Sequence, residues 1–369
     1  MHLFPDALRT ILAFAVVLGV LVFVHELGHY LAARWRGVHV EAFSIGLGRT
    51  LVSWTDRVGT VWKVSLLPLG GYVRLHGQAR PEEANAEERA LYKRGRTFWE
   101  KSVGSRAIVV AAGPVANFLL AFVLFSVLFA TVGRQVLLPD VSRLEPGGAA
   151  EHAGLQVGDH IVSIDGEATP RFEDLQRIVA AAPGRILSLR VSRGGVEQTL
   201  GVLTGSSGPA AHPVGVLGIR SGAASFEHVG PAQAVVDGAQ QTWMVGTQTL
   251  AGVWQMITGR RGTEDLGGPL RIAQLSGQVA QLGVASLVSF IAVLSVNLGL
   301  INLFPIPILD GGYLLFYLAE AVRGRPIPAR ALDYGLRAGL ALLAALFVFA
   351  TWNDLSHLGV VRWVASLLG

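Results

Sequence analysis

His25 and His29 are four positions apart, a spacing that places both side chains on one face of a helix. Two imidazoles on one face can bind a single Zn²⁺, and Glu26 can then act as general base toward zinc-activated water. The alternative interpretation is a polar cluster satisfied between helices. Glu26 lies in an apolar run, where a buried carboxylate without a compensating role costs about 2.5–3.5 kcal/mol. We therefore predict a catalytic metal site.

A catalytic zinc takes three protein ligands and keeps one position open for water. The chain has no cysteine, so the third ligand must be His, Asp or Glu. Asp310 is the candidate, because it follows another apolar run that would bring it to the same side of a membrane as His25 and His29. Pro305 and Pro307 would break a helix there, which a membrane tolerates only where the backbone lines a polar cavity. Taken alone, the Asp-Gly-Gly sequence would indicate only a turn.

These residues belong to a chain with the composition of a membrane protein. Hydrophobic residues make up 51% of the 369 positions and charged residues 15%, against about 25% charged in soluble domains. Four apolar runs approach the ~20 residues that cross a bilayer: Ala7–Ala33, Ala107–Val132, Leu282–Phe304 and Leu336–Trp352. The first run could instead be a signal peptide, but no Ala-x-Ala-like cleavage site follows it. We expect a retained span.

Basic residues near the ends of these runs predict the orientation of the chain. With four spans they all fall on one side, which the positive-inside rule makes cytoplasmic: Arg34, Arg36, Lys93, Arg94, Arg96, Lys101, Arg106, Arg323, Arg325 and Arg330. Both termini and the segment between the second and third spans then face outward, and the metal site lies toward the cytoplasm. The same residues explain the pI of 9.7. No basic stripe with interleaved aromatics is present, so nucleic acid is excluded as a partner.

The segments between the spans have patterns of their own. Val38–Leu75 predicts β-structure with a hairpin turn at Asp56–Gly59. Its expected strands are Leu51–Trp54, Thr60–Leu67 and Tyr72–Leu75. The charged stretch from Pro81 to Arg96 predicts a solvated helix or linker. The amphipathic pattern of Pro231–Thr258 predicts a helix on the membrane surface.

A soluble module is predicted over about Leu137–Val202. Strands alternate with glycine turns through Glu145–Gly166, and the helix Phe172–Ala182 and two further strands complete the pattern. This arrangement resembles a bacterial PDZ domain. A Gly/Ser/Pro-rich linker is expected at Ser206–Pro213.

The fold class expected from these patterns is an α-helical polytopic membrane protein with four transmembrane helices, a membrane-associated β-region and one inserted α+β PDZ domain. The expected order is: 1–36, first span with His-Glu-x-x-His; 37–106, cytoplasmic or membrane-associated β-region and charged linker; 107–133, second span; 134–205, PDZ domain; 206–281, linker and amphipathic surface helix; 282–312, third span with Leu-Asp-Gly; 313–335, cytoplasmic loop; 336–369, fourth span and tail.

The motifs in this order resemble those of the site-2 protease family, especially its bacterial regulator-of-sigma-E type. They are His25-Glu-Leu-Gly-His29 in a first span, a PDZ domain, and Asn302-Leu-Phe-Pro leading to Leu309-Asp310-Gly311. The resemblance covers essentially the whole chain. It implies that His25, His29 and Asp310 bind Zn²⁺, that Glu26 is the catalytic base, and that Asn302 helps to hold the substrate backbone.

Three further segments resemble signatures of the same family. Phe43–Gly48, which contains Gly46 and Gly48, resembles its membrane-associated β-region. Leu67–Tyr72, which contains Gly70 and Gly71, resembles a signature near the active site, and Gly113–Asn117 resembles one in the second span. The four named glycines are therefore candidate substrate-binding residues. Two features depart from the family: many relatives carry His at the position of Tyr313, and some have two PDZ domains.

The resemblance implies an intramembrane zinc metalloendopeptidase of the bacterial inner membrane. Its substrates would be single-span membrane proteins, such as trimmed anti-sigma factors, or signal-peptide remnants. Such helices must first be extended, which an exposed strand edge in Phe43–Leu75 could achieve by strand addition. A PDZ groove between Val141–Leu144 and Phe172–Ala182 would either bind a substrate C-terminus or exclude bulky ectodomains.

Two other classes of function fit parts of the sequence. One is a PDZ-bearing membrane scaffold without protease activity, which the intact ligand set and Glu26 argue against. The other is a zinc-binding transporter. Transporters are typically built from two similar halves with paired broken helices, and this sequence shows no such repeat.

Overall fold

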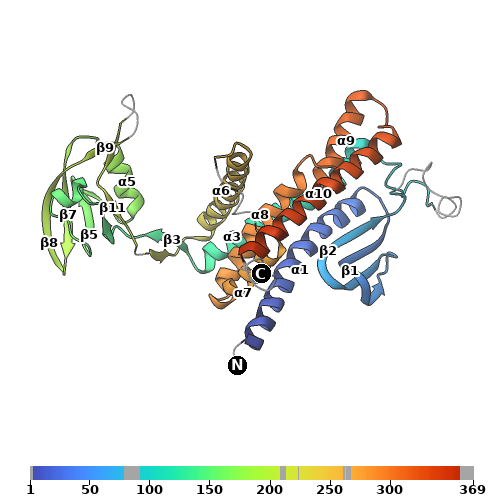
Figure 1. Cartoon of the computed structure of the whole chain (residues 1–369), viewed down its shortest axis with the longest axis horizontal. Coiled ribbons are helices and arrows are strands. Elements are labelled where there is room, and N and C mark those ends of the chain that lie inside the picture. The colour runs from blue at the N-terminus through green and yellow to red at the C-terminus, as the bar shows by residue number, and fades with distance from the viewer. Residues whose placement is uncertain are drawn as a thin grey trace, which may run out of the picture. The chain divides into compact units, whose positions relative to one another are not determined.

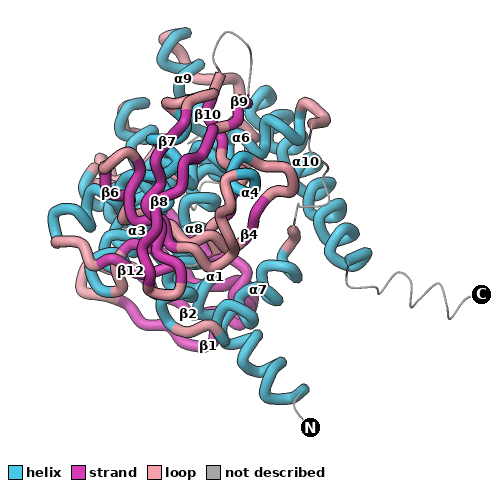
Figure 2. The backbone as a smooth tube through the Cα atoms, turned by 90° about the vertical axis from the view of Figure 1, so that its left-hand side faces the viewer, coloured by secondary structure: helices cyan, strands magenta, loops and turns pink. Residues whose placement is uncertain are grey.

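A computed structural model describes residues 3–78, 92–207, 213–222, 224–260, 262 and 267–357. The chain forms two compact units, one from Met1–Leu128 with Ala232–Gly369 and the other from Phe129–Pro231. Figure 1 labels the elements of both units, and Figure 2 separates helices from strands. The first unit contains the residues of the predicted metal site.

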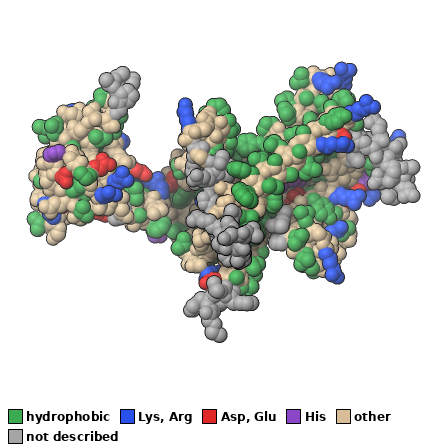
Figure 3. All heavy atoms as spheres, in the orientation of Figure 1, with side chains coloured by type: hydrophobic (Ala, Val, Ile, Leu, Met, Phe, Trp, Pro, Cys, Tyr) green, Lys and Arg blue, Asp and Glu red, His purple; other side chains and the backbone are tan. Residues whose placement is uncertain are grey.

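Four helices of the first unit are long and apolar enough to cross a membrane, by length and composition. They are α1 (Leu3–Trp35), α3 (Val103–Thr131), α8 (Val284–Leu303) and α10 (Ala329–His357). Only 6% of the most apolar 18-residue stretch of α10 is buried, and hydrophobic side chains gather over this helix in Figure 3. Helices that expose this much apolar surface are suited to lipid rather than water. A helix of the required length and composition is thus present at each of the four predicted spans, and α8 ends at Leu303, one residue before the predicted end of the third span at Phe304.

The predicted β-region forms two long strands, β1 (Val40–Thr55) and β2 (Val61–Leu75). The predicted turn joins them, and the Asp56 carboxylate accepts hydrogen bonds from the backbone N–H groups of Val58 and Thr60, both at 2.9 Å. The first part of β1, Val40–Ile45, pairs with residues 61–64 of β2 and also with residues 71–75. Among the described strands, residues 71–75 pair with no other segment, so they form one edge of the sheet.

Aromatic side chains attach this sheet to α1. The Tyr30 ring on α1 lies edge-on to Phe43 of β1 and Trp62 of β2, with centroid distances of 5.9 and 5.2 Å. Edge-to-face pairs of this kind are worth about 0.5–1.5 kcal/mol beyond their buried area. The sheet is therefore fixed beside the half of α1 that carries His25 and His29.

Three more helices lie outside the spans: α6 (Pro231–Ile257), α7 (Pro269–Gln281) and α9 (Asp310–Arg323). The helix α6 matches the predicted amphipathic helix, and its place on a membrane surface remains a prediction. The helix α7 was not expected. Its N-terminus is capped by the carboxylate of Asp354 on α10, which accepts the backbone N–H groups of Gly268, Leu270 and Arg271 at 2.8–3.1 Å.

The segment predicted as a cytoplasmic loop, 313–335, is mostly helical. Residues up to Arg323 belong to α9, where Tyr317 and Glu320 are buried, and residues from Ala329 belong to α10. Its location in the cytoplasm stays a prediction. The apolar residues of α9 come directly after the Asp310-Gly-Gly turn signal, and the helix ends in the basic stretch that contains Arg323 and Arg325. These two neighbouring signals indicated a loop. The charged segment predicted at 81–96 lies largely outside the described residues.

The second unit is an α+β domain, as expected for a PDZ-like module. Its main sheet has the order β6-β5-β7-β8, with β5 (His160–Ile164), β6 (Glu167–Ala168), β7 (Ile186–Arg193) and β8 (Val196–Leu203). The short helix α4 (Ala149–His152) and the longer α5 (Phe172–Ala180) complete the core. That core is formed by Val141, Ala150, Leu155, Ile161, Ile164, Phe172, Leu175, Val179, Ala182, Leu187, Leu189, Val191, Val202 and Leu217.

The predicted end of this domain at residue 205 is wrong, because the chain adds four short strands after that point. These are β9 (Gly205–Ser207), β10 (Val214–Val216), β11 (Ile219–Arg220) and β12 (Ala224–Glu227). β9 pairs with β10, and β12 pairs with β3 (Arg134–Leu137). The predicted linker at 206–213 is thus partly strand, and residues 208–212 lie outside the described part. Strands of two to four residues are too short to show alternation.

The predicted PDZ groove also has a different wall. Residues 143–144, which form β4, pair with β11. Strands β10 and β3 both contact α5, and β10 packs so closely that a Cβ at Gly215 would overlap the carbonyl oxygen of Val179. Neither strand belongs to Val141–Leu144, so the strands beside α5 differ from the predicted wall of the groove.

Candidate metal centre

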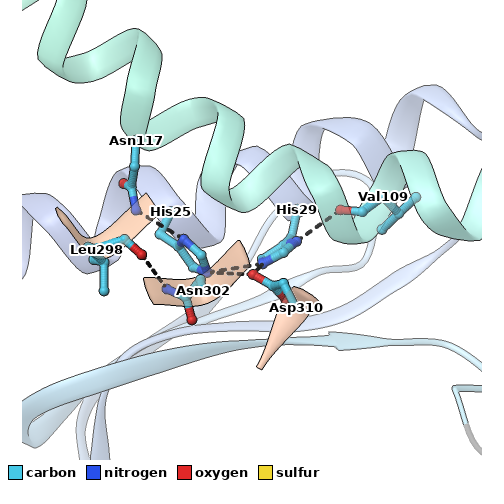
Figure 4. Close-up of polar contacts among 7 residues, drawn as sticks. All are labelled: His25, His29, Val109, Asn117, Leu298, Asn302 and Asp310. Carbon is cyan, nitrogen blue, oxygen red and sulfur yellow. Dashed lines mark hydrogen bonds and ion pairs between the residues drawn. The ribbon is translucent and has the colours of Figure 1, made fainter. Parts of the chain in front are cut away.

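Three ligand atoms converge where α1 meets the start of α9 (Figure 4). The Nε2 atoms of His25 and His29 are 3.2 Å apart. Asp310 Oδ2 lies 3.2 Å from the first nitrogen and 3.5 Å from the second. All three side chains are largely buried, with 11–17% of their surface exposed. The predicted ligands are thus brought together from positions nearly 300 residues apart in the sequence.

The other nitrogen of each imidazole has a partner on α3, which leaves Nε2 free to bind a metal (Figure 4). His29 Nδ1 lies 2.9 Å from the carbonyl oxygen of Val109 and donates its proton there. His25 Nδ1 lies 3.1 Å from the side-chain amide nitrogen of Asn117. A metal-binding histidine usually donates its second N–H to such an outer partner, which fixes the tautomer and the ring orientation.

Asn117 is fully buried, and its Oδ1 has no hydrogen-bond partner among the described residues. A half-turn of the amide places Oδ1 against His25 Nδ1, where it can accept a proton. The assignment of oxygen and nitrogen in an amide follows from its hydrogen bonds. The orphaned oxygen therefore favours the orientation that makes His25 an Nδ1–H donor and an Nε2 ligand.

Asp310 is placed by a close turn between α8 and α9. Ile308 adopts a positive φ of 89°, which is unusual for a β-branched residue. A Cβ at Gly311 would overlap the carbonyl oxygens of Leu303 and Phe304, so only glycine allows α9 to begin this close to the end of α8. Apart from the two Nε2 atoms, Asp310 Oδ2 has no partner among the described residues.

The donor set fits zinc. Two imidazole nitrogens and one carboxylate oxygen form the three-ligand set of a catalytic zinc site, and the three atoms lie within 4.8 Å of one another. Gly113 on α3 leaves room for the His29 ring in this position, because a Cβ there would overlap the imidazole. The residues that the structure brings together are therefore suited to this metal.

Glu26 lies beside the ligands in a cavity of about 970 Å³. Its Cγ packs against β2, where a Cβ at Gly71 would come within 3.1 Å. The cavity is also lined by His25, His29 and Asp310, by Tyr313 and Asn302, and by residues 71–75 along the edge of the sheet. Glu26 therefore has both the position and the open space that a general base needs beside a substrate.

The predicted substrate-binding residues divide into two groups. Asn302 and Gly71 line the cavity, and Asn302 Nδ2 donates to the carbonyl oxygen of Leu298 at 3.0 Å. Gly46, Gly48 and Gly70 have φ values of 84°, 83° and 140° and are not among the residues that line it. Their positive φ explains the choice of glycine within the strands. A direct role in substrate binding stays a prediction for all four glycines.

Two contributors to the site were not assigned by the sequence. Asn117 and Gly113 belong to a segment whose resemblance was noted, but no role followed from it. A buried Asn inside an apolar span is itself a signal, because polar side chains in a membrane are costly without a partner. The partner, His25, is 92 positions away and cannot be read from the local pattern.

Asn117→Leu should weaken zinc binding by about 10–100-fold, the usual cost of losing an outer partner of a ligating histidine. Competition with a chromophoric chelator measures the affinity. Asn297→Leu is the matched control, because Asn297 is a polar residue within a span that bonds Thr249 at 2.8 Å and does not contact the ligands. Equal affinities in the two variants would contradict a role for Asn117 in orienting His25.

The chain is similar to known proteins that are named as zinc metalloproteases or proteases. The sequence pattern of peptidase family M50 matches residues 13–346. A protein of Rhizobium meliloti (strain 1021) named "Putative zinc metalloprotease" is 45% identical over 97% of this chain and 100% of its own length. The "Regulator of sigma-E protease RseP" of Escherichia coli (strain K12) is 31% identical over 94% of this chain and 98% of its own.

A solved PDZ domain of an SdrC-like protein from Listeria monocytogenes is also similar, at 17% identity and a TM-score of 0.20 over 23% of this chain and 85% of that one. That likeness is too slight to carry an argument. The family match and the two relatives cover nearly the whole chain. The chain therefore belongs to peptidase family M50, the site-2 protease family of zinc metalloproteases.

Proposed function

We propose that this metalloprotease cuts single-span membrane proteins within or at the edge of the bilayer. The supporting observation is the meeting of His25, His29 and Asp310 beside Glu26 in one cavity. His25 and His29 lie on α1, and residues of α3 orient their rings. Both helices are long and apolar enough to span a membrane. A metal centre on such helices acts on substrates that enter from the bilayer.

The proposed chemistry is peptide hydrolysis. Zinc, when bound, polarises the scissile carbonyl and acidifies water. Glu26 accepts the proton of the attacking water and returns it to the leaving amine. Val109 and Asn117 hold the two imidazoles in the tautomer that presents Nε2. Asp310 supplies the negative charge that balances a divalent cation in a low-dielectric site.

A helical substrate hides its peptide groups in its own hydrogen bonds, so it must be extended before it is cut. The edge formed by residues 71–75 runs along the cavity and has an unpaired side among the described strands. A substrate strand added to this edge would lie beside Glu26, with its backbone held by β2. We propose this edge as the element that extends the substrate.

The substrates we propose are single-span proteins such as trimmed anti-sigma factors, or remnants of signal peptides, in the bacterial inner membrane. The name of the Escherichia coli relative supports the first choice. The PDZ-like domain would act on their outward parts. It would either bind a freshly cut C-terminus or exclude substrates with bulky ectodomains.

Cysteine labelling should place Arg94→Cys in the cytoplasm and Glu151→Cys outside. The positive-inside rule predicts this arrangement, and the chain has no native cysteine, so each introduced thiol reports alone. Both positions are exposed. A membrane-impermeant maleimide applied to intact spheroplasts should label only Glu151→Cys. Labelling of Arg94→Cys from outside would contradict the proposed topology.

Deleting Arg134–Glu227 should change substrate choice and leave the metal centre assembled. Strands β3 and β12 pair at the base of the domain, and a Cβ at Gly133 would lie 3.3 Å from the backbone nitrogen of His228, so a short linker can rejoin the chain. If the domain excludes substrates, uncut precursors become cleavable. If it binds them, trimmed substrates are cut more slowly. A folded, zinc-loaded deletion variant that cuts nothing would contradict this division of roles.

The proposed function is tested by cleavage of a single-span substrate in lipid vesicles. The purified enzyme should release two fragments, stop when a chelator removes zinc, and resume when zinc is restored. The membrane scaffold predicts no fragments, and the zinc transporter predicts zinc binding without fragments. Continued cleavage after zinc removal would also contradict the proposal, because cleavage would then not depend on the metal.

A further inference from the structure

Arg106 and Glu320 form a buried ion pair that the proposed chemistry does not use. The side chains are 4% and 9% exposed, and the guanidinium binds both carboxylate oxygens, at 2.6 and 3.3 Å. Arg106 Nε donates to the carbonyl oxygen of Lys101 at 3.2 Å. Its guanidinium carbon lies 4.3 Å from the Trp99 ring centroid and 5.0 Å from that of Tyr317. A planar group bound in this way has one well-defined position.

The pair joins α9, which carries the ligand Asp310, to α3, which contacts both histidine ligands. Arg106 lies in the first turn of α3, three residues before Val109, whose carbonyl accepts the His29 proton. Ser105, the residue before Arg106, accepts hydrogen bonds from Arg36 at the end of α1 at 2.6 and 3.2 Å. Glu320 lies on α9, the helix that begins with Asp310. The start of α3 therefore contacts both α1 and α9.

Asp310 and Glu320 lie on the same face of α9. Asp310, Tyr313, Tyr317 and Glu320 follow the i, i+3, i+7, i+10 spacing of one helical stripe, and all four line the cavity. A rotation of α9 about its axis that moved Glu320 off Arg106 would turn Asp310 away from the histidines. Because a helix rises 1.5 Å per residue, the two carboxylates are about 15 Å apart along that axis.

We propose that the Arg106–Glu320 pair fixes the rotation of α9 about its axis and thereby places Asp310 in the metal centre. Gly311 and Gly312 hold the start of α9 against the backbone of residues 303–307, which sets its position along the axis. The ion pair sets its rotation. Arg106 and Glu320 are therefore positioning residues for the third ligand. This inference rests on the proposed metal centre.

Glu320→Gln tests the role, since it keeps the shape of the side chain and removes its charge. Zinc affinity, measured by chelator competition, should fall by about 10–100-fold, as it does when an outer partner of a ligand is lost. Asp354→Asn is the matched control. Asp354 is also buried, at 3% exposure, and accepts three backbone N–H groups, but it caps α7 and does not contact α9. It should lower the unfolding temperature and leave zinc affinity unchanged.

A double variant separates positioning from general stability. Replacing a buried ion pair by apolar residues of similar volume often restores stability, so Arg106→Met with Glu320→Leu should unfold near the wild-type temperature. Its zinc affinity should stay about 10-fold or more below wild type, because the ion pair no longer sets the rotation of α9. Wild-type affinity in Glu320→Gln, or in the double variant, would overturn the inference. Wild-type protein that binds no zinc would instead overturn the proposed metal centre.

Discussion

Glu26→Gln should retain one zinc per chain and lose cleavage by about 10²–10⁴-fold, the usual contribution of a general base. The amide fills the same space beside Gly71 but cannot accept a proton from water. Glu26 is not one of the three convergent ligands, so the metal should stay bound. Zinc content and cleavage of a single-span substrate are measured on the same preparation.

Glu41→Gln is the matched control for this prediction. Glu41 lines the same cavity, but its carboxylate is occupied by His76 at 2.8 Å and Arg74 at 2.9 Å. Its loss should cost far less cleavage than the loss of Glu26. Equal activity in wild type and Glu26→Gln, with zinc bound in both, would assign the base to another residue.

Asp310→Ala should lose zinc under conditions in which wild type keeps it. Removing a ligand should cost more affinity than the about 10–100-fold typical of an outer partner. Asp310→Asn should bind weakly, because an amide keeps the shape but not the charge. Metal content after dialysis against a chelator separates these variants.

Asp333→Ala serves as the control for the loss of Asp310. It removes a carboxylate from α10 that pairs with Arg337 at 2.9 Å on the surface, and it should keep the metal. Full zinc occupancy with intact activity in Asp310→Asn would remove Asp310 from the ligand set. The centre would then need a third ligand from elsewhere.

The ligands and spans could be predicted because their signals are local. His25 and His29 share a helical turn, and the apolar runs are long enough to stand out from any soluble helix. Asp310 could be predicted from the two prolines and two glycines around it, which have little reason to interrupt a span except at a polar site. These features depend on spacing along a single element.

The parts that could not be predicted depend on pairing between distant elements. Asn117 and His25 are 92 positions apart, and Arg106 and Glu320 are 214 apart. Arg106 was interpreted only as one of several cytoplasmic basic residues. The helix α9 was missed because its buried face, with Tyr317 and Glu320, is defined by contact with α3 and not by an apolar stripe of its own.

The inserted domain shows the same limit. Its main sheet and α5 were predicted from alternation and glycine turns, while β9–β12 were interpreted as linker. These strands gain stability from partners such as β3 and β4, which precede the main sheet in sequence. Short strands of this kind are set by tertiary pairing, so their propensity is a weak guide.

X-ray absorption at the zinc edge tests the central claim most directly, because it reports the atoms around the metal. The purified wild-type chain should hold one zinc with two imidazole nitrogens at about 2.0–2.1 Å and the remaining ligands oxygen. Asp310→Asn should lose the metal or alter the oxygen shell. A zinc without imidazole ligands, or a spectrum unchanged by His25→Ala, would contradict a metal centre built from His25, His29 and Asp310.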